Sequence, residues 1–366
     1  MEDDIPYLLL TPGPLTTSRA VKQAMLRDVS TWDRDYNDIV QQIRARLVRL
    51  VSTGDDCTAV LIQGSGTYAV EATLGSVIPP QGKLLVVNNG AYGARMAQIA
   101  ARLKIEHVVI TQPEIEPASV AKVEAALAAD PAITHVALVH CETTTGMLNP
   151  AIEIGRAVRR QSRAFILDAM SSLGGIPIDI DEFSCDYVIS SANKCVQGAP
   201  GFGFVIARRA RLEQAAGWAR SLSLDLYDQW REMETKGGKW RYTSPTHIVL
   251  AFEQALNELD LEGGPAARNR RYADNHRVLV AGLTNLGYRP LLPAELRSPI
   301  ITSFLYPDNP KFSFEALYDA LKARGFVIYP GKVSQAETFR VGTIGHVFPA
   351  DFERLVQSFA EVGMTS

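Results

Sequence analysis

An aspartate and a lysine each follow an apolar run in the middle of the chain. Asp168 ends the run FILD, and Lys194 comes shortly after the run DYVISS at 186–191. An amine placed there can form a Schiff base with an aldehyde cofactor and then carry a proton. A carboxylate can keep the nitrogen of a pyridine ring protonated, so that the ring accepts electrons. Each residue also has an ordinary explanation: a surface lysine at a loop edge, and a helix cap or solvated strand end.

A second group of residues could hold a phosphate. Ser65, Gly66 and Thr67 lie between the apolar run at 59–63 and a helical stretch. Free amides at a helix start, a glycine that permits close approach and two hydroxyl groups suit a phosphate dianion, although a tight structural turn explains the same residues. The segment matches neither G-x-G-x-x-G nor the Walker A motif. A phosphate cradle, a carboxylate and a lysine at three strand ends are together what pyridoxal phosphate requires.

Three further side chains could complete a site around such a cofactor. Tyr92 follows an apolar run and either stacks on the cofactor ring or packs in the core. Thr143 either forms a hydrogen bond with the ring's phenolic oxygen or caps the turn ETTTG. Arg340 stands within the apolar pattern TFRVG, where a half-buried arginine is usually paired with an acidic neighbour. Its planar fork equally suits the carboxylate or phosphonate oxygens of a substrate.

Two other runs of charged or metal-ligating residues are not assigned a site. His140, Cys141 and Glu142 are adjacent, so on a strand their side chains point to alternate faces and cannot all bind one metal ion. The run RNRR at 268–271 is interpreted as a solvated helix face. We therefore expect no metal in this protein.

From residue 59 to about 190, short apolar runs alternate with helical stretches. This alternation predicts right-handed crossovers and a mostly parallel sheet covered on both faces, which is an α/β fold. The run at 201–209 follows the preceding one too closely for a parallel crossover, which predicts an antiparallel neighbour. Ligands of such sheets bind beyond the carboxyl ends of the strands, where the candidate residues stand. The expected strands lie at 59–63, 83–87, 107–111, 135–140, 164–170, 186–191 and 201–209.

After about residue 250 the pattern changes. A long helical region at 247–287 is followed by short apolar runs and one more helix near FSFEALYDALKARG. This order predicts a smaller α+β domain whose boundary lies near Pro245 and the helix that follows it.

The composition limits the possible classes of protein. The chain has 366 residues, 46% hydrophobic and 21% charged, with a formal net charge of −3 and a pI near 6.1. A chain of this charge lacks the basic surface of a nucleic-acid binder, and no apolar run is long enough for a signal peptide or a membrane span. The four cysteines show no zinc-ligand spacing, so we interpret them as reduced thiols of a cytoplasmic protein.

With these residues in place, the sequence resembles the class V aminotransferases, which are pyridoxal-phosphate enzymes of fold type I. The resemblance extends from TPGPL at 11–15 to FRVGTIG at 339–345. It implies a large domain (16–250) with a mostly parallel seven-stranded sheet and a smaller C-terminal α+β domain (251–366). The segment 1–15 would pack near the small domain and the active site. The resemblance also implies a homodimer with active sites at the subunit interface.

The resemblance gives each candidate residue a role. Lys194 would form the internal aldimine and Asp168 would pair with the pyridine nitrogen, and these two are the expected catalytic residues. Arg340 and Gly13 would bind substrate. Met170 stands where a smaller residue is often found, and Asn193 where relatives often carry glutamine. The residues implied to bind the cofactor are Ser65, Gly66, Thr67, Tyr92, Thr143, Asp168, Lys194 and, from the partner subunit, Thr243.

The stretches VHCETTTGMLNP, SSANKCVQGAPGFGF and GGKWRYTSPTH resemble most those members that act on an aminophosphonate. This implies 2-aminoethylphosphonate as amino donor and pyruvate as acceptor, with phosphonoacetaldehyde and L-alanine as products of a ping-pong cycle. The alternatives are an alanine–glyoxylate or serine–pyruvate transaminase, a pyridoxal-phosphate lyase and a non-catalytic protein that binds the cofactor. A lyase of the cysteine desulfurase kind would need a mobile cysteine, and Cys195 beside Lys194 is too constrained for that task.

Overall fold

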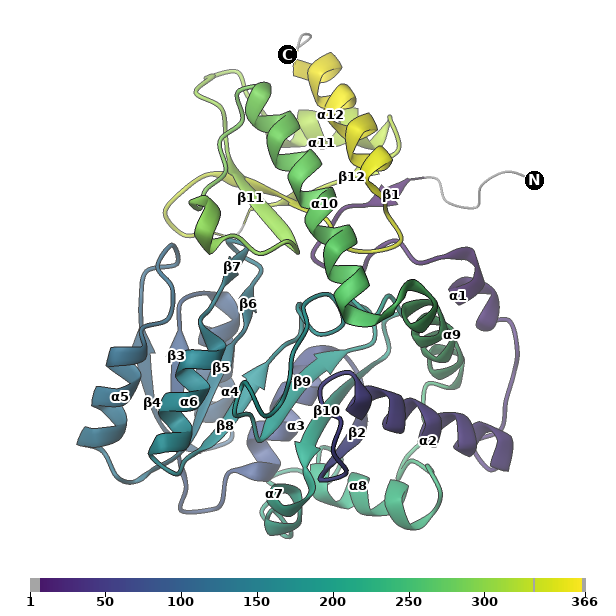
Figure 1. Cartoon of the computed structure of the whole chain (residues 1–366), viewed down its shortest axis with the longest axis vertical. Coiled ribbons are helices and arrows are strands. Elements are labelled where there is room, and N and C mark those ends of the chain that lie inside the picture. The colour runs from purple at the N-terminus through teal and green to yellow at the C-terminus, as the bar shows by residue number, and fades with distance from the viewer. Residues whose placement is uncertain (1–6, 332, 364–366) are drawn as a thin grey trace.

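The computed structural model describes residues 7–331 and 333–363. Its centre is a seven-stranded sheet in the order β2-β10-β9-β8-β5-β3-β4 (Figure 1). All seven expected strands are present, and the predicted α/β fold is confirmed. The strands are β2 (Cys57–Gln63), β3 (Lys83–Asn88), β4 (Glu106–Thr111), β5 (Ile133–Val139), β8 (Ala164–Asp168), β9 (Tyr187–Ser191) and β10 (Phe202–Arg208).

The direction of the strands follows from the connections between them. Strands β3, β4, β5, β8 and β9 pair in parallel. Strand β10 runs antiparallel to both β9 and β2, as the short connection from 191 to 202 requires. The carboxyl ends of β2, β3, β5, β8 and β9 therefore lie along one edge of the sheet, where the loops that carry the candidate residues begin.

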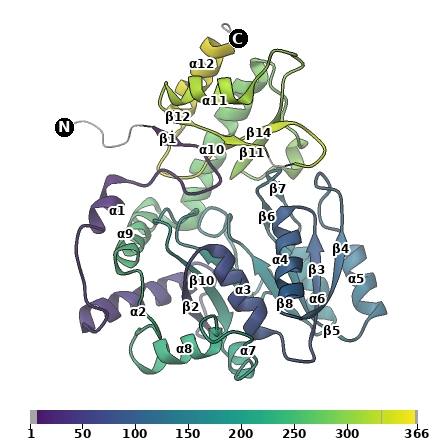
Figure 2. The same cartoon turned by 180° about the vertical axis from the view of Figure 1, so that it is seen from behind.

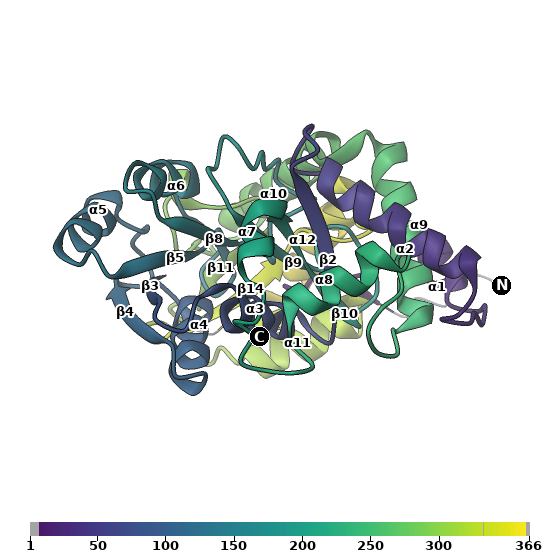
Figure 3. The ribbon, with the colours of Figure 1, turned by 90° about the horizontal axis from the view of Figure 1, so that it is seen from below.

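Helices cover both faces of this sheet, because alternate side chains of each strand point to opposite faces and both sets are apolar. Leu61 of β2 packs on one face and Val60 on the other. Figure 3 shows the two layers of helices. One layer contains α2 (Arg34–Arg49), α5 (Val120–Ala129), α6 (Ala151–Arg160) and α9 (Thr246–Glu262). The other contains α3 (Gly66–Val77), α4 (Ala91–Arg102), α7 (Arg209–Gln214) and α8 (Leu226–Thr235).

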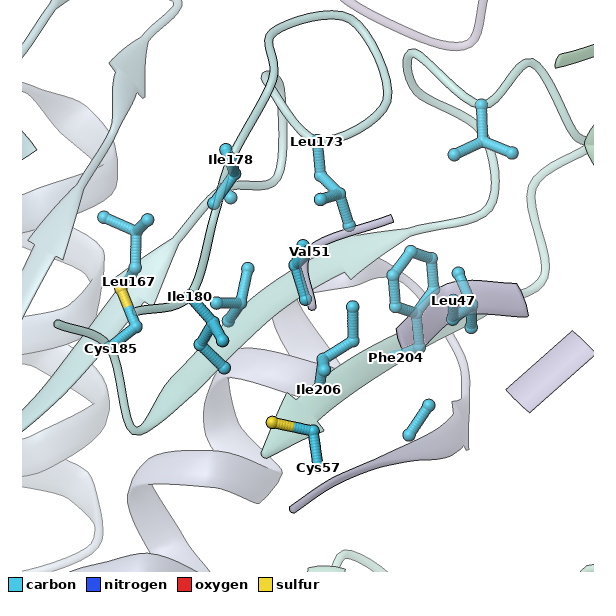
Figure 4. Packing of buried hydrophobic residues seen from close by; sticks show 14 of the residues in the cluster. Leu47, Val51, Cys57, Leu167, Leu173, Ile178, Ile180, Cys185, Phe204 and Ile206 are labelled. Atoms are coloured by element: carbon cyan, nitrogen blue, oxygen red, sulfur yellow. The ribbon is translucent and has the colours of Figure 1, made fainter. Parts of the chain in front are cut away.

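The larger of the two cores lies between the sheet and the first layer (Figure 4). Leu47 of α2 and Phe204 and Ile206 of β10 are completely buried there. Leu167, the residue before Asp168, belongs to the same core. Ile166, the residue before Leu167, packs in the core on the other face, so the strand end that carries the aspartate is held by apolar packing on both sides of the sheet.

The C-terminal residues form a smaller layer at one end of the molecule (Figures 1 and 2). Three strands pair in the order β11-β14-β13, and a core of their own lies under α10, α11 and α12. The elements are α10 (Gly264–Asn285), a 3₁₀ turn η1 (Ala294–Leu296), β11 (Ile301–Leu305), α11 (Phe314–Lys322), β12 (Phe326–Val327), β13 (Tyr329–Pro330), β14 (Thr338–Gly342) and α12 (Pro349–Gly363).

The start of the chain joins this C-terminal layer. Strand β1 (Leu8–Leu9) pairs in parallel with β12, and the short helix α1 (Arg19–Ala24) follows it. Residues 1–6 of the expected segment 1–15 lie outside the described residues. The division at residue 250 stays a prediction, and the apolar face of α9 packs in the core of the large sheet, which favours a later boundary.

The expectation that RNRR is a solvated helix face holds for Arg270, which is exposed, and is wrong for the other three residues, since Asn269 is half-buried and donates to the carbonyl of Gly175 at 2.8 Å. Helix α9 ends at Glu262, and Gly263 and Gly264, with φ of +103° and +77°, turn the chain into α10. The first turns of α10 face the protein interior, so Arg268 is buried, and Arg271 forms an ion pair with Glu262. No helix among the described residues is long and apolar enough to cross a membrane.

Candidate active site

A cavity lies at the carboxyl edge of the large sheet, where the strand-end loops meet. It brings together six of the residues singled out in the sequence, namely Ser65, Gly66, Thr67, Tyr92, Asp168 and Lys194, as well as Asn193 and Met170. They reach one place because they follow β2, β3, β8 and β9, whose carboxyl ends lie along the same edge. The remaining lining residues are Val70, Arg95, Met96 and Ser191.

The phosphate-cradle residues open helix α3. Ser65 is the N-cap residue in extended conformation, and its side chain makes no capping hydrogen bond. The first amides of the helix and the hydroxyl groups of Ser65 and Thr67 are therefore available to an anion at the positive end of the helix. A Cβ on Gly66 would lie 2.2 Å from the Sδ of Met170, so the larger residue at 170 packs closely against this turn.

Asp168 is the last residue of β8 and is buried. Its Oδ1 accepts the backbone N–H of Met170 at 2.9 Å. Burial raises the pKa of Asp168 to about 6, and the Met170 N–H and the charges of Lys194 and Arg95 act in the opposite direction. Among the described residues, no cationic side chain forms an ion pair with Asp168.

Lys194 follows β9, and its Nζ donates to the carbonyl oxygen of Pro12 at 2.5 Å. Gly13 lies beside it with φ of +127°, and a Cβ there would be 2.9 Å from the same Nζ. Glycine at 13 thus leaves room for the lysine. Burial lowers the pKa of Lys194, and Arg340 acts in the same direction, whereas Asp168 opposes it. An amine with a lowered pKa is a better nucleophile at neutral pH.

Tyr92 lies in the first turn of α4 and is held by Arg95 and Glu142, neither of which was assigned this role from the sequence. Arg95, one turn later on the same helix, stacks its guanidinium 5.1 Å from the ring centre and donates to the Oγ1 of Thr67 at 3.2 Å. Glu142 accepts the Tyr92 N–H at 3.2 Å. The i, i+3 spacing of Tyr92 and Arg95 on a helix was the one signal that could have revealed the arginine.

Glu142 also holds the loop that contains Thr143. Its Oε1 accepts from the Thr144 N–H at 3.2 Å and from the Thr144 hydroxyl at 2.9 Å. Burial raises the pKa of Glu142, while the hydrogen bonds from Thr144 and Tyr92 lower it. The Oγ1 of Thr143 is buried and has no hydrogen-bond partner among the described residues. Such a hydroxyl needs a partner that binds at this edge of the site.

Arg340 lies on β14, and the structure excludes an ion pair with an acidic neighbour among the described residues. Its Nε donates to the Pro330 carbonyl at 2.9 Å and its Nη1 to the Thr143 carbonyl at 3.0 Å. The side chain is buried above the ring of Tyr329. A buried guanidinium whose described partners are neutral carbonyls is suited to an incoming anion.

Thr243 does not join the other candidates in this chain. It is exposed and lines a separate surface hollow with Trp240 and Tyr242. Among the described residues, no group of three histidine, cysteine, aspartate or glutamate side chains could hold a metal ion. His140 instead bonds Ser172 Oγ at 2.9 Å, and Cys141 donates to Ser298 Oγ at 3.3 Å.

The fold and this set of residues define a class of protein. The chain matches the family described as Aminotransferase class-V over residues 16–332 and belongs to it. It is an aminotransferase, and its cofactor is pyridoxal phosphate. A solved structure of alanine–glyoxylate aminotransferase from Nostoc sp. is 25% identical, with a TM-score of 0.88, and the match covers 99% of this chain and 96% of that one.

Relatives of higher identity carry one particular name. A 2-aminoethylphosphonate–pyruvate transaminase of Syntrophobacter fumaroxidans is 64% identical over 353 residues, which are 96% of this chain and 95% of the relative. A protein of the same name from Phocaeicola vulgatus is 57% identical over 359 residues, 98% of this chain and 99% of the relative.

The residues at the sheet edge fit pyridoxal phosphate. The uncapped start of α3 offers amides and hydroxyls for the phosphate, and Asp168 is a buried carboxyl group that forms no ion pair within the described part of the chain. The partnerless hydroxyl of Thr143 is available to a polar ring atom. Gly13 leaves space at the amine of Lys194, which a side chain would close.

Proposed function

We propose that this chain transfers the amino group of 2-aminoethylphosphonate to pyruvate, which yields phosphonoacetaldehyde and L-alanine. The names of relatives that match nearly the full chain at 57–64% identity support these substrates. The observation that carries the proposal is Arg340, a buried guanidinium that makes no ion pair with a described residue and whose side chain meets the loop of Thr143.

Within this proposal, Lys194 and Asp168 are the catalytic residues. Pyridoxal phosphate, when bound, supplies a ring that accepts the electron pair left by the departing proton of the substrate. Lys194 binds the cofactor between reactions, and its free amine moves a proton between the two carbon atoms that exchange it. The lowered pKa of this amine favours the neutral form that accepts a proton. Asp168 holds the proton on the ring nitrogen.

The other cofactor-binding residues hold pyridoxal phosphate and orient its ring. Ser65, Gly66 and Thr67 hold the phosphate at the start of α3, and Tyr92, fixed by Arg95, stacks on the ring. Thr143 bonds the phenolic oxygen of the ring. Two of these assignments use side chains that the described residues leave free for a ligand: Ser65 makes no capping hydrogen bond, and the hydroxyl of Thr143 has no partner among the described residues.

Arg340 and Gly13 bind the substrate. The donor presents phosphonate oxygens and the acceptor presents a carboxylate, and a guanidinium can bind either through two parallel hydrogen bonds. Because the cycle is ping-pong, only one of the two substrates occupies the site at a time. One arginine can therefore serve both half-reactions.

A single experiment tests the substrates. The visible absorbance of the protein loaded with cofactor is recorded before and after the addition of 2-aminoethylphosphonate alone, and again after pyruvate. We expect the donor to remove the band and pyruvate to restore it with formation of L-alanine. If 2-aminoethylphosphonate leaves the band unchanged but L-alanine or L-serine with glyoxylate changes it, the proposed substrates are wrong. That result would favour an alanine–glyoxylate or serine–pyruvate transaminase.

Replacing Arg340 by lysine tests whether the guanidinium of Arg340 binds the substrate anion through two hydrogen bonds. We expect kcat/KM for 2-aminoethylphosphonate to fall roughly 10- to 100-fold, which corresponds to the loss of one hydrogen bond to a charged group. The visible spectrum should stay that of wild type, since Arg340 does not hold the cofactor. Arg289→Lys, an exposed arginine of the same C-terminal layer, is the control. Equal kcat/KM in both variants would remove Arg340 from the substrate site.

We further propose a homodimer in which Thr243 completes the phosphate site of the partner. Tyr68, two residues after Gly66, and Tyr242 are half exposed and line one groove, an exposure of aromatic side chains that is typical of an interface. Thr243→Ala should then weaken cofactor binding. A mixture of Thr243→Ala and Lys194→Ala subunits should regain tight binding at one site per dimer, because the Lys194→Ala subunit supplies the missing threonine. A monomer by light scattering would contradict this arrangement.

A cytoplasmic location stays a prediction from the thiols. All four cysteines are free and buried.

A further inference from the structure

Two residues of the RNRR run bind the backbone on both sides of the active site. Arg268 donates through Nη1 to the carbonyl of Cys195 at 2.9 Å and to that of Val196 at 3.3 Å, in the loop directly after Lys194. Arg271 donates through Nη1 to the carbonyls of Gly345 at 2.9 Å and Val347 at 2.7 Å. These two carbonyls lie in the segment that follows β14, the strand of Arg340.

Glu262, the last residue of α9, joins the two arginines. Its Oε2 lies 2.7 Å from Arg268 Nη2, and its Oε1 lies 2.8 Å from Arg271 Nε. Burial raises the pKa of Glu262, but the two guanidinium groups outweigh it and leave the pKa below its usual value. The carboxylate is therefore charged at neutral pH and holds both arginines in place.

Gln197 makes a direct connection between the same two segments. It is buried, and its side-chain Nε2 donates to the hydroxyl of Tyr272 at 2.6 Å and to the carbonyl of Gly345 at 2.8 Å. The hydroxyl of Tyr272 also accepts the Gly345 N–H at 3.2 Å. The N–H of Gln197 donates to the carbonyl of Lys194 at 2.7 Å, which closes a turn around the lysine.

The backbone of Gln197 is strained. Its φ is +71°, a left-handed conformation that costs free energy for a residue other than glycine and persists where surrounding contacts enforce it. The residue is held there by its N–H bond to the carbonyl of Lys194 and by the two side-chain hydrogen bonds to Tyr272 and Gly345. Backbone outliers of this kind cluster at functional sites, and this one stands three residues from Lys194.

From these contacts we infer that Gln197, Glu262, Arg268, Arg271 and Tyr272, here called the α10 clamp, are positioning residues that set the place of Lys194 relative to Arg340. The clamp ties the loop of the amine that moves the proton to the strand of the arginine that binds the substrate anion. Small displacements between a proton-transfer group and its substrate cost much rate, since the reacting atoms must lie within hydrogen-bonding reach. This inference rests on the proposed roles of both residues.

The charge state of Lys194 gives the clamp a measurable signature. The titratable and charged groups around this amine are Asp168, Cys195, Cys141 and Arg340. Burial is the largest cause of its lowered pKa. A loosened loop would let water reach the lysine nitrogen, and water favours the charged form. In the enzyme loaded with cofactor the visible band follows the protonation of the same nitrogen in its Schiff base, and water favours that protonated form as well, so the pH at which the band titrates should rise.

The experiment compares Gln197→Leu and Tyr272→Phe with wild type. Gln197→Leu replaces the amide by an apolar side chain of similar volume, and Tyr272→Phe keeps the ring. Both changes remove side-chain hydrogen bonds of the clamp, and the second is the milder one should the first fold poorly. We expect the titration midpoint of the visible band to rise by at least about half a pH unit. We also expect kcat with 2-aminoethylphosphonate and pyruvate to fall at least about tenfold, while the KM values change less than threefold.

Gln112→Leu is the matched control. Gln112 is a buried glutamine at the end of the edge strand β4, and its Nε2 also donates to a backbone carbonyl, that of Pro117 at 2.8 Å. It should lower thermal stability without a change of midpoint or kcat. The same behaviour in both clamp variants would overturn the inference and leave the clamp a purely structural network. If 2-aminoethylphosphonate does not change the spectrum of wild type, the proposed donor is wrong. The titration midpoint of the visible band still tests the clamp, because that measurement needs no amino donor.

Discussion

Replacing Lys194 by alanine should reduce kcat by roughly 10⁴-fold, the upper end of what a positioned acid–base group contributes. The amine is the one basic nitrogen lining the cavity whose pKa is lowered by burial, and it lies where Gly13 leaves space for it. The variant should still bind pyridoxal phosphate through the phosphate cradle. It should form no covalent link to the cofactor that borohydride can trap.

Lys122→Ala is the control for this variant. Lys122 is an exposed lysine of α5, on the far side of the sheet from the cavity, and its loss should change neither kcat nor trapping. Trapping of the cofactor on Lys194→Ala would show that another lysine holds it, and the assignment of Lys194 would then be wrong.

Replacing Asp168 by asparagine should lower kcat roughly 100- to 1000-fold, the range found when one preorganised electrostatic group is removed. Asparagine keeps the shape and the acceptor for the Met170 N–H, so only the charge is lost. Without a negative charge next to it, the ring nitrogen gives up its proton more easily and the ring accepts electrons less well. Steady-state kinetics of Asp168→Asn and Asp168→Glu separate charge from geometry, and an unchanged kcat in Asp168→Asn would exclude this role.

The same variant should be more stable than wild type when both are free of cofactor. Burial raises the pKa of Asp168 from 3.8 to about 6 in the folded chain, so the folded chain binds the proton more tightly than the unfolded chain. The stability from this group is full below about pH 4 and is lost as the pH rises to about 6. Above pH 6, Asp168→Asn should gain of the order of 3 kcal/mol in the free energy of unfolding. Chemical denaturation of wild type and Asp168→Asn at pH 4 and pH 7.5 measures this gain. The same difference in unfolding free energy at both pH values would contradict burial of the Asp168 charge as its cause.

The sequence by itself determined the sheet and the strand ends that carry the chemistry. The apolar runs that contain Leu61 and Leu167 are hydrophobic at nearly every position, since both faces of a parallel sheet are covered, and this pattern is visible without a structure. Because parallel strands end at one edge, Asp168 and Lys194 could be placed together from their positions after two strands. The burial of Asp168 at this edge also follows from the apolar pattern of the strand that it ends.

Only the tertiary structure decided the contacts between segments far apart in the chain. The sequence left open whether Arg340 meets a carboxylate, and the fold brings it to the carbonyl of Thr143, 197 residues away. The sequence pattern predicted that Arg268 is exposed to solvent, because charged residues at the start of a helix are usually hydrated. In the structure the Arg268 guanidinium is buried, and two carbonyls of the Lys194 loop and one carboxylate satisfy its hydrogen-bonding groups. Local pattern determines which element forms. Which polar groups find partners depends on long-range packing, which no short stretch of sequence encodes.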